Sequence, residues 1–176
     1  MEMSKHERHK TLIDAVCAVT TDQQTLAIAR WWEMNPNGHA AGHLDHYLSG
    51  RGGTKPVDLQ AVLREDFGVR DTVTKGILAS LKQGQVSGKV PVPQSAYRDK
   101  DWQYALGGIN IEWSATGPSG GPPYKAATVT ARFKNQYRWH PKEARITQAV
   151  HQAAERLKTQ GAQDFWMEGQ GLVAIH

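Results

Sequence analysis

Cysteine is almost absent from this chain, and its scarcity limits both redox and metal chemistry. Cys17 is the single cysteine among 176 residues, so the sequence can form neither an intramolecular disulfide nor a CxxC zinc site. The apolar neighbours of Cys17 in LIDAVCAVT favour a small buried side chain over a catalytic nucleophile.

Long apolar runs are also missing. No run approaches the roughly 18 to 20 residues that span a bilayer. The N-terminal stretch MEMSKHERHKTLIDAV has no apolar core of the kind found in signal peptides. We therefore expect a protein without a transmembrane segment that is exported by a route reading no cleavable signal, or that otherwise stays in the cytoplasm.

A strong excess of one charge is the third absence. The chain has 21 Lys and Arg against 17 Asp and Glu, a net charge of +4, and its basic residues are scattered rather than clustered. This mild excess favours anionic partners, among them nucleic acid, lipid head groups and phosphorylated precursors, without choosing one class. The absence of a dense basic cluster makes nucleic acid the less favoured partner.

Helical periodicity dominates the first part of the chain, residues 1–84. Apolar residues recur at helical spacing, separated by glycine and proline breaks. The expected helices cover residues 10–19, 20–34, 38–49, 56–68 and 70–84.

The second part, residues 85–176, predicts a β-β-α-β order. Alternating apolar residues indicate an antiparallel hairpin of residues 107–115 and 126–137, and a last strand or small hairpin within 163–176. Between them, residues 140–161 carry an unbroken apolar stripe that predicts an amphipathic helix. We expect a single α+β domain over residues 1–176, with a helical N-terminal half packed on a small antiparallel sheet and one long C-terminal amphipathic helix.

Three histidines stand four and three residues apart in HAAGHLDHYLSG, residues 39–50. On a helix, His39, His43 and His46 fall within about 60° of one another and border the apolar face. The first spacing suits zinc, but the glutamate that zincins carry after their first histidine is an alanine here. Three interpretations stay open: a metal site, a partly solvated polar surface, and a single functional histidine, His46 beside Tyr47. We predict that the three histidines hold no metal.

SGRGGTK, residues 49–55, is glycine-rich and basic. It lacks the GxxxxGK[ST] spacing of a phosphate-binding loop, so its glycines are better explained by a tight helix exit. Arg51 remains a candidate contact for an anion.

NQYRWHPKEAR, residues 135–145, lies where a predicted strand gives way to a predicted helix N-terminus. Backbone N–H groups and the helix dipole attract anions at such a junction. Tyr137 and His140 offer acid–base groups, and Arg138 and Arg145 offer positive charge. The alternative is ordinary packing of the aromatic residues with solvated charges.

Together, HYLSGRGGTKPVDL, ALGGINIEWSATG and NQYRWHPKEAR resemble the C-terminal toxin domains of bacterial competition proteins. The likeness runs discontinuously over residues 44–145 and is strongest to lipid II-degrading bacteriocins of the colicin M type. That family shows a His-Tyr-Leu helix followed by glycine, a later Ala-Leu-Gly strand, and a strand ending in Asp-x-Tyr-Asp with a downstream arginine. Tyr137 and Arg145 match the motif, whereas Asn135 and Arg138 replace its two acids. Because metal-assisted cleavage of a pyrophosphate needs carboxylates, the resemblance implies a toxin-like domain rather than that reaction.

We therefore expect a secreted antibacterial toxin or effector, a hydrolase acting on an anionic envelope substrate in the periplasm of a rival cell. The resemblance implies an immunity protein and a secretion-system carrier as partners, and no cofactor is identified. One cleft is expected to hold the candidate catalytic residues His46, Tyr137, His140 and Arg145 and the candidate substrate-binding residues Tyr47, Arg51 and Arg138. Two other readings stay open: a non-catalytic binding or adaptor module, and a toxin acting on nucleic acid.

Overall fold

The computed structural model describes residues 5–18, 34–116, 128–137, 152 and 156–175. The chain forms two compact units: unit 1 comprises Met1–Gly53 and Gln136–Phe165, and unit 2 comprises Thr54–Asn135 and Trp166–His176. Each unit is therefore assembled from two separate stretches of sequence. The single domain expected from the sequence stays a prediction.

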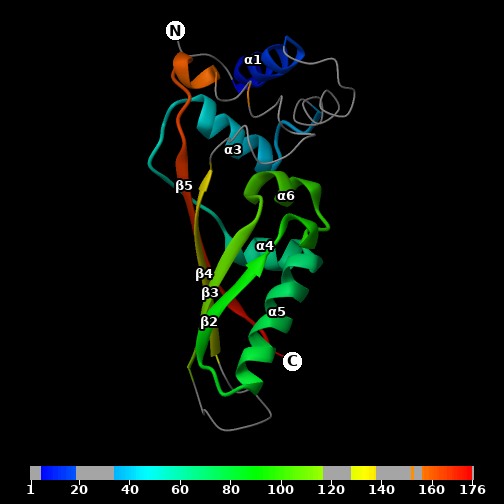
Figure 1. The fold of residues 1–176 in the computed structure, drawn as a ribbon. Coiled ribbons are helices and arrows are strands. Elements are labelled where there is room, and N and C mark those ends of the chain that lie inside the picture. The colour runs from blue at the N-terminus through cyan, green and yellow to red at the C-terminus, as the bar shows by residue number, and fades with distance from the viewer. Residues whose placement is uncertain (1–4, 19–33, 117–127, 138–151, 153–155, 176) are drawn as a thin grey trace. The chain divides into compact units, whose positions relative to one another are not determined.

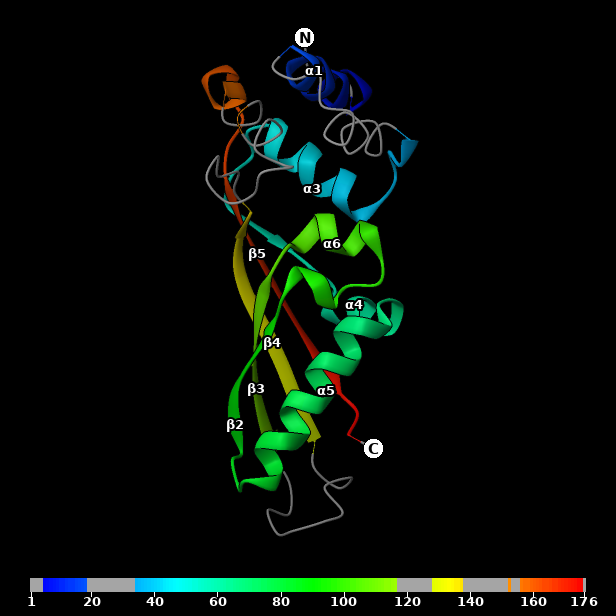
Figure 2. The same cartoon turned by 45° about the vertical axis from the view of Figure 1, so that its right-hand side comes forward.

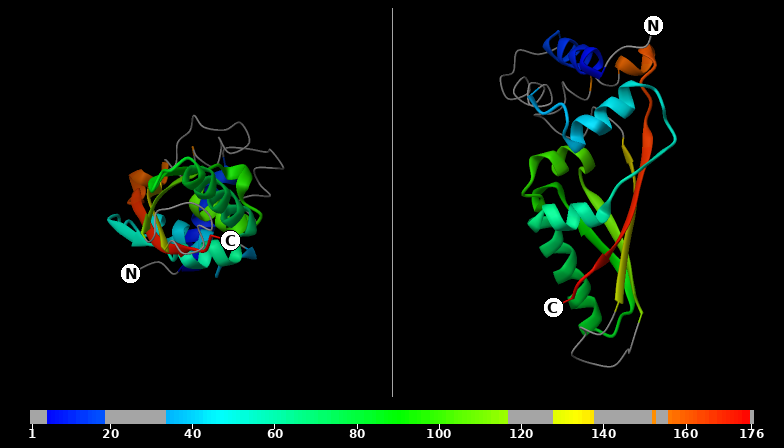
Figure 3. Two further views of the ribbon diagram at one scale, coloured as in Figure 1. Left: turned by 90° about the horizontal axis from the view of Figure 1, so that it is seen from below. Right: turned by 180° about the vertical axis from the view of Figure 1, so that it is seen from behind.

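A five-stranded sheet makes up most of unit 2. Its order is β1-β5-β4-β3-β2, with β2 antiparallel to β3, β3 antiparallel to β4, and β1 parallel to β5. Figure 3 shows β5 running beside β4. The strands are β1 (Thr54–Pro56), β2 (Ser87–Val92), β3 (Ile109–Thr116), β4 (Thr128–Tyr137) and β5 (Phe165–Val173).

The expected fold class is wrong in two respects. The sheet is mixed rather than antiparallel, because β1 pairs in parallel with β5. The described residues also show no long C-terminal amphipathic helix, and their last element is strand β5. Between Tyr137 and β5, the residues described as α-helical are 152, 156 and 157, followed by the 3-10 turn Lys158–Gln160 and by Gly161, whose φ of 105° is left-handed. Much of the range 140–161 lies outside the described residues.

Helices α4 (Leu59–Glu65) and α5 (Phe67–Lys82) lie on one face of the sheet (Figures 1 and 2). Helix α5 buries apolar residues at four-residue spacing, which places them in one stripe. Gly76 lets the helix approach β2, because a Cβ atom there would lie 2.8 Å from the methyl carbons of Val90. The stripe consists of Val69, Val73, Ile77 and Leu81.

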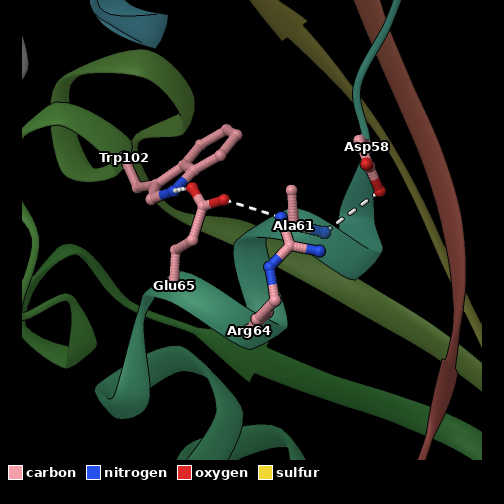
Figure 4. Close-up of polar contacts among 5 residues, drawn as sticks. All are labelled: Asp58, Ala61, Arg64, Glu65 and Trp102. Carbon is pink, nitrogen blue, oxygen red and sulfur yellow. Dashed lines mark hydrogen bonds and ion pairs between the residues drawn. The ribbon is translucent and has the colours of Figure 1, made fainter.

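Side-chain hydrogen bonds fix the ends of these helices. Asp58 caps α4 by accepting from the backbone N–H of Ala61 at 3.0 Å. At the other end of α4, the Oε2 atom of Glu65 accepts from the indole N–H of Trp102 at 3.1 Å (Figure 4). Trp102 belongs to helix α6 (Lys100–Leu106) and is buried. The bond therefore ties α6 to α4 within unit 2.

Asp66 is the fully buried carboxylate of unit 2. It caps α5 by accepting from the backbone N–H of Val69 at 3.0 Å. The same carboxylate accepts from the backbone N–H groups of Arg98, at 3.2 and 3.0 Å, and of Asp99, at 2.9 Å. Three donors from two distant segments thus satisfy one buried charge, as burial of a charge requires.

The other face of the sheet presents charged side chains. Glu112 on β3 pairs with Lys89 on β2 at 2.8 Å and with Arg132 on β4 at 3.2 Å. The hydrogen bond from Lys89 is the main cause that lowers the pKa of Glu112. Lys134 on β4 lies 3.6 Å from Glu168 on β5. These exposed pairs order the surface and contribute little to stability.

Strand β2 tolerates a proline at the sheet edge. The carbonyl of Val86 accepts from the N–H of Ala115 at 2.8 Å, which makes these two residues a hydrogen-bonded pair. Pairs alternate along an antiparallel ladder, so Pro91 and Asn110 are a non-hydrogen-bonded pair. The missing N–H of Pro91 therefore faces outward, where it removes a donor that another strand would use.

Unit 1 contains helices α1 (Lys5–Cys17) and α3 (His39–Leu48), together with the end of β4 and the first residue of β5. Helix α1 contacts α3, and Val16 of α1 is buried. The side chain of Cys17 and nearly all of the helix expected over residues 20–34 lie outside the described residues. Among the described helices, none is long and apolar enough to cross a membrane.

Candidate functional site

Helix α3 places its three histidines in different environments. His39 is exposed, His43 is 4% exposed, and His46 is half-buried. The turn of the helix explains the difference, because Leu44 and Tyr47, which are fully buried, define the inward face. The three histidines therefore do not share one environment.

The half-buried histidine belongs to an aromatic cluster built around Phe165, the first residue of β5. The ring of His46 lies 4.4 Å from that of Phe165, and the ring of Tyr137 stacks on Phe165 at 4.8 Å and 19°. His43 meets Tyr137 and Phe165 edge-on, at 5.8 and 5.9 Å. Tyr47 completes the cluster at 6.1 Å from Tyr137. We call these five residues the Phe165 cluster; all belong to unit 1.

The glycine-rich loop after α3 orients His46. The Nε2 atom of His46 lies 2.9 Å from the carbonyl oxygen of Gly52, within hydrogen-bond distance. Gly50, Gly52 and Gly53 have φ angles of 67°, 53° and 68°, in the left-handed region that favours glycine. The tight helix exit expected for SGRGG therefore also places a backbone carbonyl on the imidazole ring.

The loop is held against the segment that leads into β5. A Cβ atom on Gly50 would collide with the carbonyl oxygen of Gly161, and one on Gly52 would lie 2.7 Å from Oε1 of Gln163. The backbone N–H of Gln163 also donates to the carbonyl of Tyr47 at 3.0 Å. The loop that orients His46 thus packs against the segment that leads into the strand carrying Phe165.

Tyr137 is 7% exposed, and its burial has a chemical consequence. Burial raises the pKa of Tyr137 well above its ordinary value, and the nearby Tyr47 adds to the increase. Its phenol therefore keeps its proton near neutral pH and cannot act there as a base.

The structure describes four of the seven candidate site residues. His46, Tyr47 and Tyr137 meet in the Phe165 cluster, and Arg51 is exposed on the glycine loop. The other three candidates lie outside the described residues and stay predictions: Arg138, His140 and Arg145.

Sequence reasoning missed Phe165 and the carbonyl of Gly52. Phe165 was within a segment expected to be a strand, and its alternation with Met167 marks it as an inward residue. Its neighbours in the cluster come from α3 and β4, far away in the sequence, so alternation alone could not identify them. The direction of a backbone carbonyl cannot be predicted from the type of residue that carries it. The glycines that allow the turn are the only sequence signal of it.

The described residues contain no group of three or more His, Cys, Asp or Glu side chains placed to hold a metal ion. Within this part of the chain, the chemistry of the Phe165 cluster comes from imidazole, phenol and backbone carbonyl groups. Arg51, five residues after His46, supplies a positive charge on the loop that contacts His46.

Comparison with known proteins gives no match to a protein family, to a curated protein or to a solved structure. The resemblance to colicin M-type bacteriocins therefore rests on the sequence motifs alone.

Proposed function

We propose that the chain is an antibacterial effector that hydrolyses an anionic ester of the cell envelope, with His46 as its general base. The observation that supports this proposal most is the fixed orientation of His46. Its Nε2 atom bonds to the Gly52 carbonyl, and its ring packs against Phe165. A general base needs a fixed orientation and a pKa near the working pH, and histidine is the side chain whose ordinary pKa meets that need.

In the proposed reaction, a water molecule attacks the phosphorus atom or the carbonyl carbon of the substrate. At the same time, His46 removes a proton from that water molecule. The bond to the leaving oxygen breaks, and the imidazolium returns the proton to that oxygen. Positive charge stabilises the oxyanion that develops. Arg51 is the described candidate for this role, and Arg138 and Arg145 are the candidates from sequence.

Tyr137 has a positioning role in this proposal. Its ring stacks on Phe165, which in turn contacts His46. Because the phenol is buried, the ring is the part of Tyr137 that the site uses. Tyr137→Phe keeps the ring and should retain killing, whereas Tyr137→Ala should lose it.

Expression in a bacterium, once in the cytoplasm and once with a periplasmic leader, tests the proposal. Killing is expected from the periplasmic form and should disappear in His46→Ala. His39→Ala is the matched control, because His39 lies on the same helix, is exposed and is not part of the Phe165 cluster. Full killing by a folded His46→Ala variant would refute the proposal.

The charged face of the sheet, opposite α4 and α5, supports a second candidate, a non-catalytic module that binds single-stranded nucleic acid. Trp166 is 43% exposed, and the ammonium group of Lys134 lies 5.4 Å from the centre of its ring. Exposed aromatic rings beside cations bind single strands by stacking and by charge. However, Lys89, Arg132 and Lys134 exceed the acidic residues paired with them, Glu112 and Glu168, by one charge only.

Fluorescence anisotropy of a labelled oligonucleotide separates the two candidates. The second candidate predicts binding that weakens in Trp166→Ala and with added salt, and no killing from either compartment. Killing from the cytoplasm alone would instead indicate a toxin that acts on nucleic acid.

A further inference from the structure

The hydrogen bond between His46 and the glycine loop determines which ring nitrogen carries a proton. A backbone carbonyl oxygen can only accept a hydrogen bond. The Nε2 atom of His46, 2.9 Å from the oxygen of Gly52, must therefore be the donor. This holds for the neutral ring and for the imidazolium alike, since Nε2 keeps its proton in both.

We infer that Gly52 is a positioning residue, whose carbonyl locks His46 in the Nε2–H form and leaves Nδ1 as the nitrogen that gains and loses the proton. The functional part of this inference rests on the proposed role of His46 as a base. Among the described residues, Nδ1 has no hydrogen-bond partner, so it is the nitrogen available to a substrate or a water molecule.

Three features of the structure explain why the loop that directs this carbonyl requires glycine. Gly52 is buried and has a φ of 53°, which a residue with a side chain adopts only with strain. A Cβ atom at this position would lie 2.7 Å from Oε1 of Gln163. Gly50, two residues earlier, lies so close to the Gly161 carbonyl that it also excludes a side chain. The glycines of SGRGG thus act through His46, by fixing the direction of one carbonyl group.

The hydrogen bond between His46 and the Gly52 carbonyl also matters after proton transfer. When Nδ1 takes a proton from water, the ring becomes positively charged, and its hydrogen bond from Nε2 to the carbonyl strengthens. The carbonyl dipole therefore stabilises the imidazolium without itself gaining a proton. Comparable partners on the second ring nitrogen orient catalytic and metal-binding histidines in other sites.

Nitrogen-15 NMR of the full-length protein tests the inference directly. In the neutral ring, we expect a one-bond proton–nitrogen signal at Nε2 of His46 that exchanges slowly with water. The chain unfolded in urea should show no such protected signal. The His46→Gln variant identifies the resonance by its loss.

Two glycine variants separate positioning from general backbone strain. Gly52→Ala should weaken or abolish the protected Nε2–H signal. Gly53→Ala is the matched control, because Gly53 has a similar φ of 68° with open space around it, and the carbonyl that faces His46 belongs to Gly52. Gly53→Ala should keep the signal.

A His46 ring protonated at Nδ1 alone would overturn the inference, and so would an Nε2–H signal that exchanges as fast as in the chain unfolded in urea. Equal loss of the signal in both glycine variants would also overturn it. The killing assay tests the proposed function separately. A protected Nε2–H signal together with full killing by His46→Ala would refute the proposed function and leave the tautomer assignment intact.

Discussion

Removal of the Asp66 carboxylate should destabilise unit 2 far more than removal of an ordinary helix cap. Asp66→Ala loses the cap of α5, a change that costs about 1–2 kcal/mol. It also leaves the part-buried N–H groups of Arg98 and Asp99 without their acceptor, at about 1 kcal/mol each, near the low end for unsatisfied donors. The total is about 3–4 kcal/mol, a large share of the stability of a typical domain.

Asp58→Ala is the matched control for this prediction. Asp58 is exposed and caps α4 through a single hydrogen bond to Ala61, so its loss should cost about 1 kcal/mol. Urea unfolding followed by tryptophan fluorescence measures both changes, because the buried Trp102 and Trp113 report on unit 2. With a slope of about 2 kcal/mol per molar urea, the midpoint should fall by about 1.5–2 M for Asp66→Ala and about 0.5 M for Asp58→Ala. Equal shifts would refute the idea that one carboxylate joins three backbone donors.

Three further predictions concern protonation, backbone strain and metal. Burial raises the pKa of Tyr97 and of Tyr137 above the usual value of 10.0, with a smaller contribution from Asp66 in the case of Tyr97. Because the folded state then holds these protons more tightly than the unfolded state, the stabilisation is present below about pH 10 and is lost as pH rises beyond it. Absorbance near 295 nm should show that Tyr97 and Tyr137 ionise only on unfolding. Gly50→Ala should lower the thermal midpoint more than Gly84→Ala, since both glycines have left-handed φ angles but only Gly50 lies against another backbone carbonyl. A chelator should leave the thermal midpoint unchanged, whereas a drop that zinc restores would indicate a bound metal.

Local patterns predicted those elements of the fold that depend on neighbouring residues. The hairpin of β3 and β4 follows from alternation, and α5 follows from its apolar stripe. Strand β1 could not be predicted, because its three residues, Thr54–Pro56, have no periodicity and are a strand only through pairing with Trp166–Glu168. The expected start of α5 at residue 70 was late by one turn, since the role of Asp66 as its cap is not evident from the adjacent residues.

The candidate site shows the same division between local and distant information. The motif residues His46 and Tyr137 were expected to lie together, and both contact Phe165. What the sequence could not supply was the intermediary, because Phe165 is more than 100 positions from His46 and 28 from Tyr137. The Gly52 carbonyl was likewise hidden, since its direction depends on the backbone φ angles of Gly50, Gly52 and Gly53 rather than on a side chain.

The departures from the bacteriocin motif explain why His46 carries the proposed chemistry. Asn135 stands where the family has its first acid, and its side-chain amide donates to the carbonyl of Gly108 at 3.2 Å, tying β4 to the residue just before β3. A carboxylate at this position would set two oxygen acceptors against each other, so the amide suits the local structure. Arg138 replaces the second acid with a positive charge. In the proposed function, the positive charge of Arg138 is a candidate to attract the anionic substrate, and the base comes from elsewhere in the chain. Within the described residues, His46 is the proposed base: its ring and that of Tyr137 both contact Phe165, and its Nε2–H donates to the Gly52 carbonyl, which leaves Nδ1 for the proton of the proposed reaction.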